Sequence, residues 1–75
     1  MTQNPMIIEY MMKHGSITPI EAMMEIGCMR LASRISEIEK MGYVIGREWI
    51  KVKNRFGEMI TVKKYWIISF PEVAA

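Results

Sequence analysis

Residues 28–41, CMRLASRISEIEKM, carry polar side chains whose types and spacing suit contact with nucleic-acid bases. Arg30 and Arg34 are one helical turn apart, and each guanidinium could donate two hydrogen bonds to the edge of a guanine. Ser33 and Glu37 fall on the same helix face and could contact either bases or phosphates. The stretch therefore predicts a recognition helix that enters the major groove of duplex DNA.

The opposite face of this stretch is apolar and can be buried. Its apolar residues recur at helical spacing: Cys28, Leu31, Ala32, Ile35 and Ile38. Gly42 follows as a left-handed cap that ends the helix. Cys28 is the only cysteine of the chain, so it cannot form an internal disulfide and is expected to be a small buried hydrophobe.

A first helix is expected from Gln3 to His14. Asn4 can act as its N-cap, and Pro5 suits the first helical position because its missing N–H would have no partner there. Gly15 ends the helix.

A capping box opens a second helix after an extended connector, or three-residue strand, at 16–18. In TPIE at 18–21, the threonine hydroxyl and the glutamate carboxylate can each accept a backbone N–H at the start of the helix. The helix is expected to run to about Ile26, and Gly27 supplies the turn before the recognition helix. Its inward residues are expected to be Ile20, Met23 and Met24. Two helices joined by a tight glycine-containing turn match the helix-turn-helix pattern.

After Gly42 the apolar period changes from helical to alternating, which predicts a β-hairpin. NRFG at 54–57 supplies its turn, since Asn suits the first position of a type I turn and Gly can adopt the left-handed fourth position. Counting back from this turn pairs Val52 with Ile60, Ile50 with Val62 and Glu48 with Lys64. Residues 43–45 and 65–68 are expected to form the base of the hairpin, with Trp66 packed on the helices as a large anchor.

Positive charge is concentrated in this hairpin. The chain has a net charge of only +2, but residues 1–42 carry a net charge of −1 and residues 43–75 carry +3. Phosphate contact by such a hairpin adds affinity without sequence information and weakens as salt increases. The residues predicted to contact DNA are Thr18, Arg30, Ser33, Arg34, Glu37, Lys51, Lys53, Asn54, Arg55, Lys63 and Lys64.

Two segments resemble a family of small helix-turn-helix proteins found mostly in phages and prophages. They are HGSITPIEAMMEIGCMRLASRISEIEKMGYVI and KVKNRFG followed by YW, which cover most of residues 13–66. The resemblance implies a winged-helix DNA-binding fold, a regulatory role and no enzymatic activity. Glu37 and Glu39 stand at usually basic positions of that family, which leaves room for a domain that binds protein instead.

The composition argues against an enzyme or a membrane protein. There is no Asp and only one His, and the sequence has no catalytic-triad spacing, glycine-rich phosphate loop or metal-ligand cluster, so we expect no cofactor and no metal. No apolar run approaches the roughly 20 residues of a membrane span, and MTQNPM does not resemble a signal peptide, so we expect a cytoplasmic protein.

The sequence therefore predicts an α+β winged helix-turn-helix domain over residues 1–70, followed by a loose tail that includes 71–75. The expected partner is double-stranded DNA, read by helix 28–41 with the 47–66 hairpin on phosphates or a minor groove. The protein could act as a transcriptional regulator or as an excision or replication accessory protein, and as a monomer or a homodimer. The alternative is a winged helix that docks on a host protein through Trp49, Phe56 and Tyr65.

Overall fold

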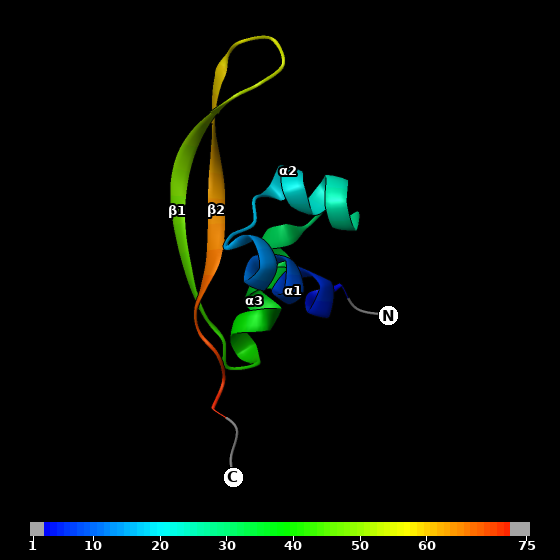
Figure 1. Ribbon diagram of the computed structural model, residues 1–75, viewed down its shortest axis with the longest axis vertical. Helices are drawn as coiled ribbons and strands as arrows, with labels where there is room; N and C mark the ends of the chain where they lie inside the picture. Colours follow the sequence, from blue (N-terminus) through cyan, green and yellow to red (C-terminus); the bar gives the residue numbers. More distant parts are fainter. Residues whose placement is uncertain (1–2, 73–75) are drawn as a thin grey trace.

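Three helical segments precede a two-stranded antiparallel hairpin, which confirms the predicted α+β winged-helix architecture (Figure 1). The computed structural model describes residues 3–72. The elements are α1 (Asn4–His14), α2 (Pro19–Glu21), the π-helix η1 (Ala22–Ile26), α3 (Leu31–Lys40), β1 (Val44–Lys53) and β2 (Met59–Ser69). No helix in this described part is long and apolar enough to cross a membrane.

Helix α1 begins and ends close to the predicted residues, but Asn4 does not cap it. The N-cap is Gln3, which makes no side-chain capping hydrogen bond, and Asn4 is the first residue of the helix. Asn4 is buried, and its Nδ2 donates to Oε1 of Glu37 on α3 over 3.0 Å. The N-cap prediction was wrong because the Asn4 side chain donates its hydrogen bond to α3 and not to the backbone of its own helix. Gly15 ends α1 in the left-handed conformation, as predicted.

The capping box of the second helix is confirmed. Thr18 Oγ1 accepts from the backbone N–H of Glu21 over 3.3 Å, and the Thr18 N–H donates to Glu21 Oε1 over 3.0 Å. After this single α-helical turn the backbone widens into η1, and the N–H of Cys28 donates to the carbonyl of Ala22 over 3.0 Å. The second helix is therefore a short α-turn that continues as a π-turn.

The apolar residues of the second helix point outward, contrary to prediction. Ile20, Met23 and Met24 are all exposed, and Ala22 is the buried residue of α2 and η1. The segment approaches the core through this small alanine, and the π-turn changes the angular spacing of the residues that follow it. Because Ala22 faces the core, its neighbours Met23 and Met24 are turned away from the core, and Ile20, which precedes the π-turn, is exposed as well.

Helix α3 begins at Leu31, three residues later than predicted. Cys28 still belongs to the preceding turn through its hydrogen bond to Ala22, and Arg30 is the N-cap, with φ −131° and ψ 62°. The buried face is as expected except that Ala32 is exposed, because the core-facing positions follow the narrower stripe Leu31, Ile35 and Ile38. Cys28 is buried beside this stripe, as predicted.

The hairpin has the predicted register. Its pairs include Val52 with Ile60, Ile50 with Val62 and Glu48 with Lys64. The N–H of Gly57 donates to the Asn54 carbonyl over 3.0 Å, and Gly57 has a φ of 83°, as the predicted turn requires. The two strands are long, and their distal half projects beyond the helices as a wing (Figure 1).

Residues 16–18 do not form a three-residue strand; Ile17 alone pairs with the sheet, as a single β-bridge to Tyr65. Its N–H donates to the Tyr65 carbonyl over 2.8 Å, and the Tyr65 N–H donates back to Ile17 over 2.9 Å. This bridge attaches the chain between α1 and α2 to the middle of β2. It also fixes the base of the wing to the helical body.

Tyr65, and not Trp66, is the aromatic anchor of the core. Tyr65 is 4 % exposed and packs with apolar residues of the helices, whereas Trp66 is only partly buried. Successive side chains of a strand point to opposite faces, so the two residues cannot both face the helices. Trp66 lies over Gly46 of β1, where a Cβ atom would collide with the indole ring. The predicted anchor residue was therefore wrong by one position, since Tyr65 and not Trp66 packs on the helices.

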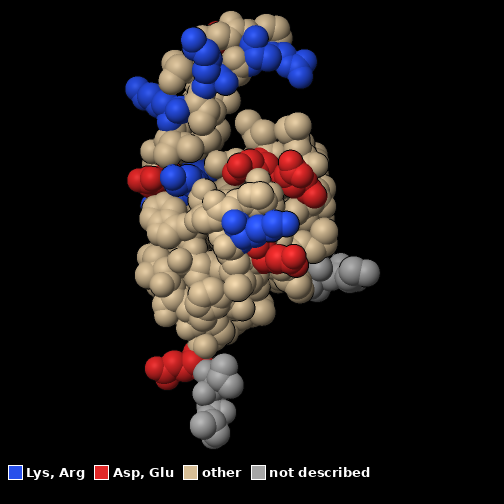
Figure 2. All heavy atoms as spheres, viewed as in Figure 1, with Lys and Arg blue, Asp and Glu red and all other residues tan. Residues whose placement is uncertain are grey.

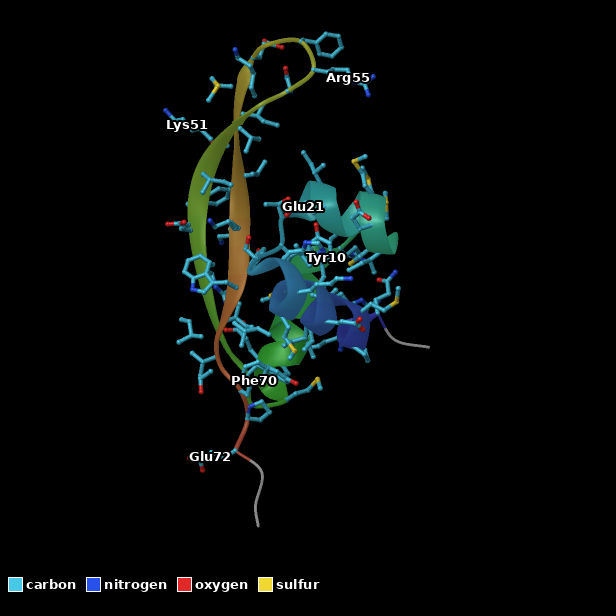
Figure 3. The ribbon with its side chains drawn as sticks, viewed as in Figure 1. Tyr10, Glu21, Lys51, Arg55, Phe70 and Glu72 are labelled. Carbon is cyan, nitrogen blue, oxygen red and sulfur yellow. The ribbon has the colours of Figure 1, made fainter. Side chains whose placement is uncertain are left out.

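Ser69 and Phe70 lead from the hairpin into the segment that was predicted as a tail. Ser69 is the last residue of β2, and the Phe70 ring lies edge-on to Tyr43 with the centroids 5.7 Å apart. Pro71 follows in contact distance of Gly42, and Glu72 is exposed (Figure 3). Residues 73–75 of the expected tail lie outside the described residues.

Candidate nucleic-acid interface

The distal half of the wing carries the densest positive charge on the face shown in Figure 2, beyond the helical body. Lys51 and Lys53 lie at the end of β1, and Arg55 follows in the turn; all three are exposed (Figure 3). Lys63 and Lys64 lie on β2 and are partly buried. The hairpin thus places all five predicted phosphate contacts on one structural unit.

These five cations differ in how far they are already engaged. Lys64 Nζ lies 3.7 Å from Glu48 Oε1, and Lys63 Nζ lies 4.9 Å from the centre of the Trp49 ring. Among residues 3–72, Lys51, Lys53 and Arg55 form no ion pair. The charge available to an external anion is therefore concentrated at the tip of the wing.

Asn54 builds the turn at this tip. Its Oδ1 accepts from the N–H of Phe56 over 2.9 Å and from the N–H of Glu58 over 3.0 Å. Its N–H donates to the Glu58 carbonyl over 2.8 Å, which closes the turn. An Asn side chain that bonds backbone two residues ahead is a common turn device. The structure thus gives this predicted DNA contact a conformational role.

Two residues at the beginning of α3 have the exposure that base contact requires. Arg30, the N-cap, and Ser33, in the first turn, are both exposed. No ion pair engages Arg30 within the described residues. Because Arg30 precedes the helix, its side chain leaves from a non-helical residue and not from the helix face shared by Ser33 and Arg34.

Arg34 is held by a neighbour on its own helix. Its Nη1 lies 3.3 Å from Oε1 and 3.1 Å from Oε2 of Glu37. Its Nε is buried and has no hydrogen-bond partner among residues 3–72. The hydrogen bond from Asn4, together with the charge of Arg34, holds the pKa of Glu37 below its ordinary value. Glu37 therefore holds the arginine in place. The bond from Asn4 to Glu37 could not be predicted from local spacing, because the two residues lie far apart along the chain.

Glu39, the other glutamate of α3 at a position expected to be basic, is also paired. Glu39 Oε2 lies 2.6 Å from Arg47 Nη2 on β1. Arg47 also lies over the Tyr65 ring, 5.7 Å from its centre. Glu37 and Glu39, which stand at positions expected to be basic, are thus each paired with an arginine of the same chain. Glu37 also connects α3 to α1 through Asn4, and Glu39 connects α3 to β1 through Arg47.

The other predicted contact, Thr18, is occupied by the capping box. Its hydroxyl lies 3.1 Å from Glu21 Oε1 and 3.3 Å from the Glu21 N–H. Glu21 also accepts from the Tyr10 hydroxyl over 3.3 Å, which joins α1 to α2 (Figure 3). Partial burial, followed by the charge of Glu21, raises the pKa of Tyr10. On the face shown in Figure 2, acidic side chains lie on the helical body together with basic ones.

The comparison with known families agrees with this arrangement. The family described as "Winged helix-turn-helix domain" matches residues 2–69, which includes all three helical segments and both strands of the wing. Comparison with curated proteins and with solved structures finds no match. The architecture is associated with DNA binding, through a recognition helix and a basic wing. The chain belongs to the winged helix-turn-helix domain family.

Proposed function

We propose that the protein binds duplex DNA and regulates transcription. In this proposal the start of α3 enters the major groove, and the wing contacts phosphates or an adjacent minor groove. The observation that carries it is a group of three exposed cations at the tip of a wing in a winged helix-turn-helix fold, Lys51, Lys53 and Arg55, which form no ion pair within the described part of the chain.

The proposed contacts divide into two classes. Arg30 and Ser33 would contact bases, and Arg34, fixed by Glu37, would present a guanidinium whose position is set before binding. The tip cations would neutralise phosphates and release counterions, so each one should add about 0.9 to the slope of log affinity against log salt concentration. Lys63 and Lys64 would contribute less because they already have partners in the hairpin.

Selection of bound sites from random duplex DNA tests this function. We expect an enriched motif, and affinity for that motif that falls steeply between about 50 and 200 mM salt. A palindromic motif would indicate a homodimer and a single half-site a monomer. Recovery of no enriched site at low salt would contradict the proposal. A reporter gene carrying the motif then separates transcriptional control from an excision or replication role, in the phage or prophage setting that the resemblance implies.

Docking on another protein is the second candidate function. An apolar hollow between α2 and the wing favours it, lined by residues that include Ile20, Met23, Val52, Phe56 and Ile60. Exposed apolar surface of this kind often marks an interaction site. Of the three aromatic residues predicted for docking, Trp49 and Phe56 are exposed, but Tyr65 is buried in the core. Capture of a single protein that is insensitive to salt and to Lys53→Ala would favour docking over DNA binding.

A further inference from the structure

Phe56 is a large apolar side chain in the turn of the wing, and it is 79 % exposed. The turn lies at the end of the molecule opposite the C-terminal segment (Figure 1). Single exposed apolar residues are ordinary on a protein surface. Three features of this one distinguish it from a residue of that kind.

The first feature is a rigid support. Four hydrogen bonds hold the five-residue turn that carries the ring: two to Asn54 Oδ1, one from Gly57 to the Asn54 carbonyl and one between the backbones of Asn54 and Glu58. Such a turn fixes the backbone beneath Phe56 before any partner arrives. Little ordering entropy remains to oppose insertion of the ring.

The second feature is the charge around the ring. Arg55 is adjacent in sequence and Lys53 precedes the turn, both exposed, and Glu58 is the single acidic residue between 51 and 64. Residues 51–58 carry three cations and one acidic residue, so a partner that covers the ring must accept a net positive charge beside an apolar side chain. Stacked bases next to phosphates offer an apolar surface beside negative charge.

The third feature is the shape of the tip. The axes of two paired strands are about 4.8 Å apart before side chains are counted, so the paired strands are too broad for the minor groove of B-DNA, which is about 6 Å wide. A single side chain at the turn that joins the strands is small enough to enter that groove. The exposed ring of Phe56 occupies such a position.

We propose that Phe56 acts as a wedge, entering a base step from the minor groove while Lys53 and Arg55 contact the flanking phosphates. This inference rests on the proposed DNA binding and adds a further function, the kinking of the duplex. Apolar wedges of this kind unstack a step and bend DNA by about 20–90° toward the major groove. The preferred step is a pyrimidine–purine step, TA or CA/TG, because such steps unstack most easily.

The experiment uses the full chain and a duplex of the selected site with 2-aminopurine at the step beneath the wing. Fluorophores at the two ends of a second duplex report bending by energy transfer. For the wild type we expect 2-aminopurine fluorescence to rise and end-to-end transfer to increase on binding. Replacing the TA step by a GC step should weaken binding about tenfold, the effect of 1.4 kcal/mol, which lies within the range for one altered base pair.

Variants separate the wedge from the binding itself. Phe56→Ala should still bind, with an unchanged salt slope, but lose the fluorescence rise, the bend and the TA preference. Phe56→Leu, which keeps an apolar side chain, should retain part of the fluorescence rise, part of the bend and part of the TA preference. Met24→Ala, which shortens an equally exposed side chain on η1, should behave as the wild type.

Retention of the fluorescence rise and the bend by Phe56→Ala would overturn the wedge, as would a wild type that binds without bending. Both outcomes leave DNA binding intact, whereas absence of any wild-type binding overturns the proposed function and the wedge with it. Circular dichroism spectra matching the wild type would show that the variants are folded.

Discussion

Asn4 and Glu37 are 33 positions apart in the chain, and a 3.0 Å hydrogen bond joins the Asn4 amide to the Glu37 carboxylate. The same carboxylate holds the guanidinium of Arg34. The first residue of α1 thus supports, through Glu37, the position of an arginine of α3 that we propose to contact DNA. Asn4 itself is buried.

Removal of the Asn4 amide should weaken both the fold and the proposed interface. We expect Asn4→Ala to lower the free energy of unfolding by about 1 kcal/mol, because the Glu37 carboxylate loses the hydrogen bond that it accepts from the Asn4 amide. Urea denaturation measures this change. Ser36→Ala, an exposed position on α3, is the control and should be near neutral. Equal stability of the two variants would show that the bond to Glu37 contributes nothing.

Glu37 should make stability depend on pH in the acid range. Its folded pKa is lowered, so the ionised carboxylate stabilises the fold above its ordinary pKa, and this contribution is lost as pH falls through the folded pKa. Wild type should therefore exceed Glu37→Gln in stability near pH 7, with the difference shrinking toward about pH 3. Thermal melts across that range measure it. A difference that is constant with pH would contradict the assigned cause.

Gly46 should not tolerate a side chain, because Trp66 occupies the space where its Cβ would lie. We expect Gly46→Ala to destabilise the protein by about 1–3 kcal/mol, the usual effect of overpacking. In a Trp66→Ala background the same change should cost much less, since the indole is gone. Chemical denaturation of the four proteins in this double-mutant cycle tests the contact. Equal costs in both backgrounds would assign the effect to the backbone.

The capping box of the second helix should contribute measurably to stability. Thr18→Ala removes the hydroxyl that accepts from the Glu21 N–H, and we expect a loss of about 1 kcal/mol. Thr18→Ser retains the hydroxyl and should lose less. Thr61→Ala, at an exposed position of β2, controls for the loss of a threonine elsewhere. Unfolding by urea distinguishes the three variants.

The two classes of proposed DNA contact should respond differently to mutation. Lys53→Ala should weaken binding to all sequences alike and reduce the salt slope by about 0.9. Arg30→Ala should cost about 1–3 kcal/mol on the selected site and relax specificity at one base pair. Anisotropy titrations on the selected and scrambled duplexes measure both effects. A uniform loss for Arg30→Ala would move this residue to the phosphate class.

The sequence predicted best those features that depend on neighbouring residues. The hairpin register follows from the Asn54–Gly57 turn and strict alternation, and the capping box follows from residues three apart. The inward placement of Met23 and Met24 failed because the local pattern does not show that the small residue Ala22 faces the core in place of the larger apolar residues beside it. The bond from Asn4 to Glu37 and the pair of Glu39 with Arg47 depend on how distant elements pack. The predicted DNA contacts themselves remain predictions.

Charge is unequally divided between the two parts of this small fold. The portion up to residue 42 has a net charge of −1, so without the hairpin it would be weakly repelled by any polyanion. Attraction of a polyanion must then come from the hairpin, which extends beyond the helices and is attached to the helical body through Ile17 and Tyr65 (Figure 1). In the proposed function, the attraction of DNA by the hairpin and the discrimination between sequences by α3 can therefore be altered separately, since the hairpin tip can be changed without disturbing the packing of α3.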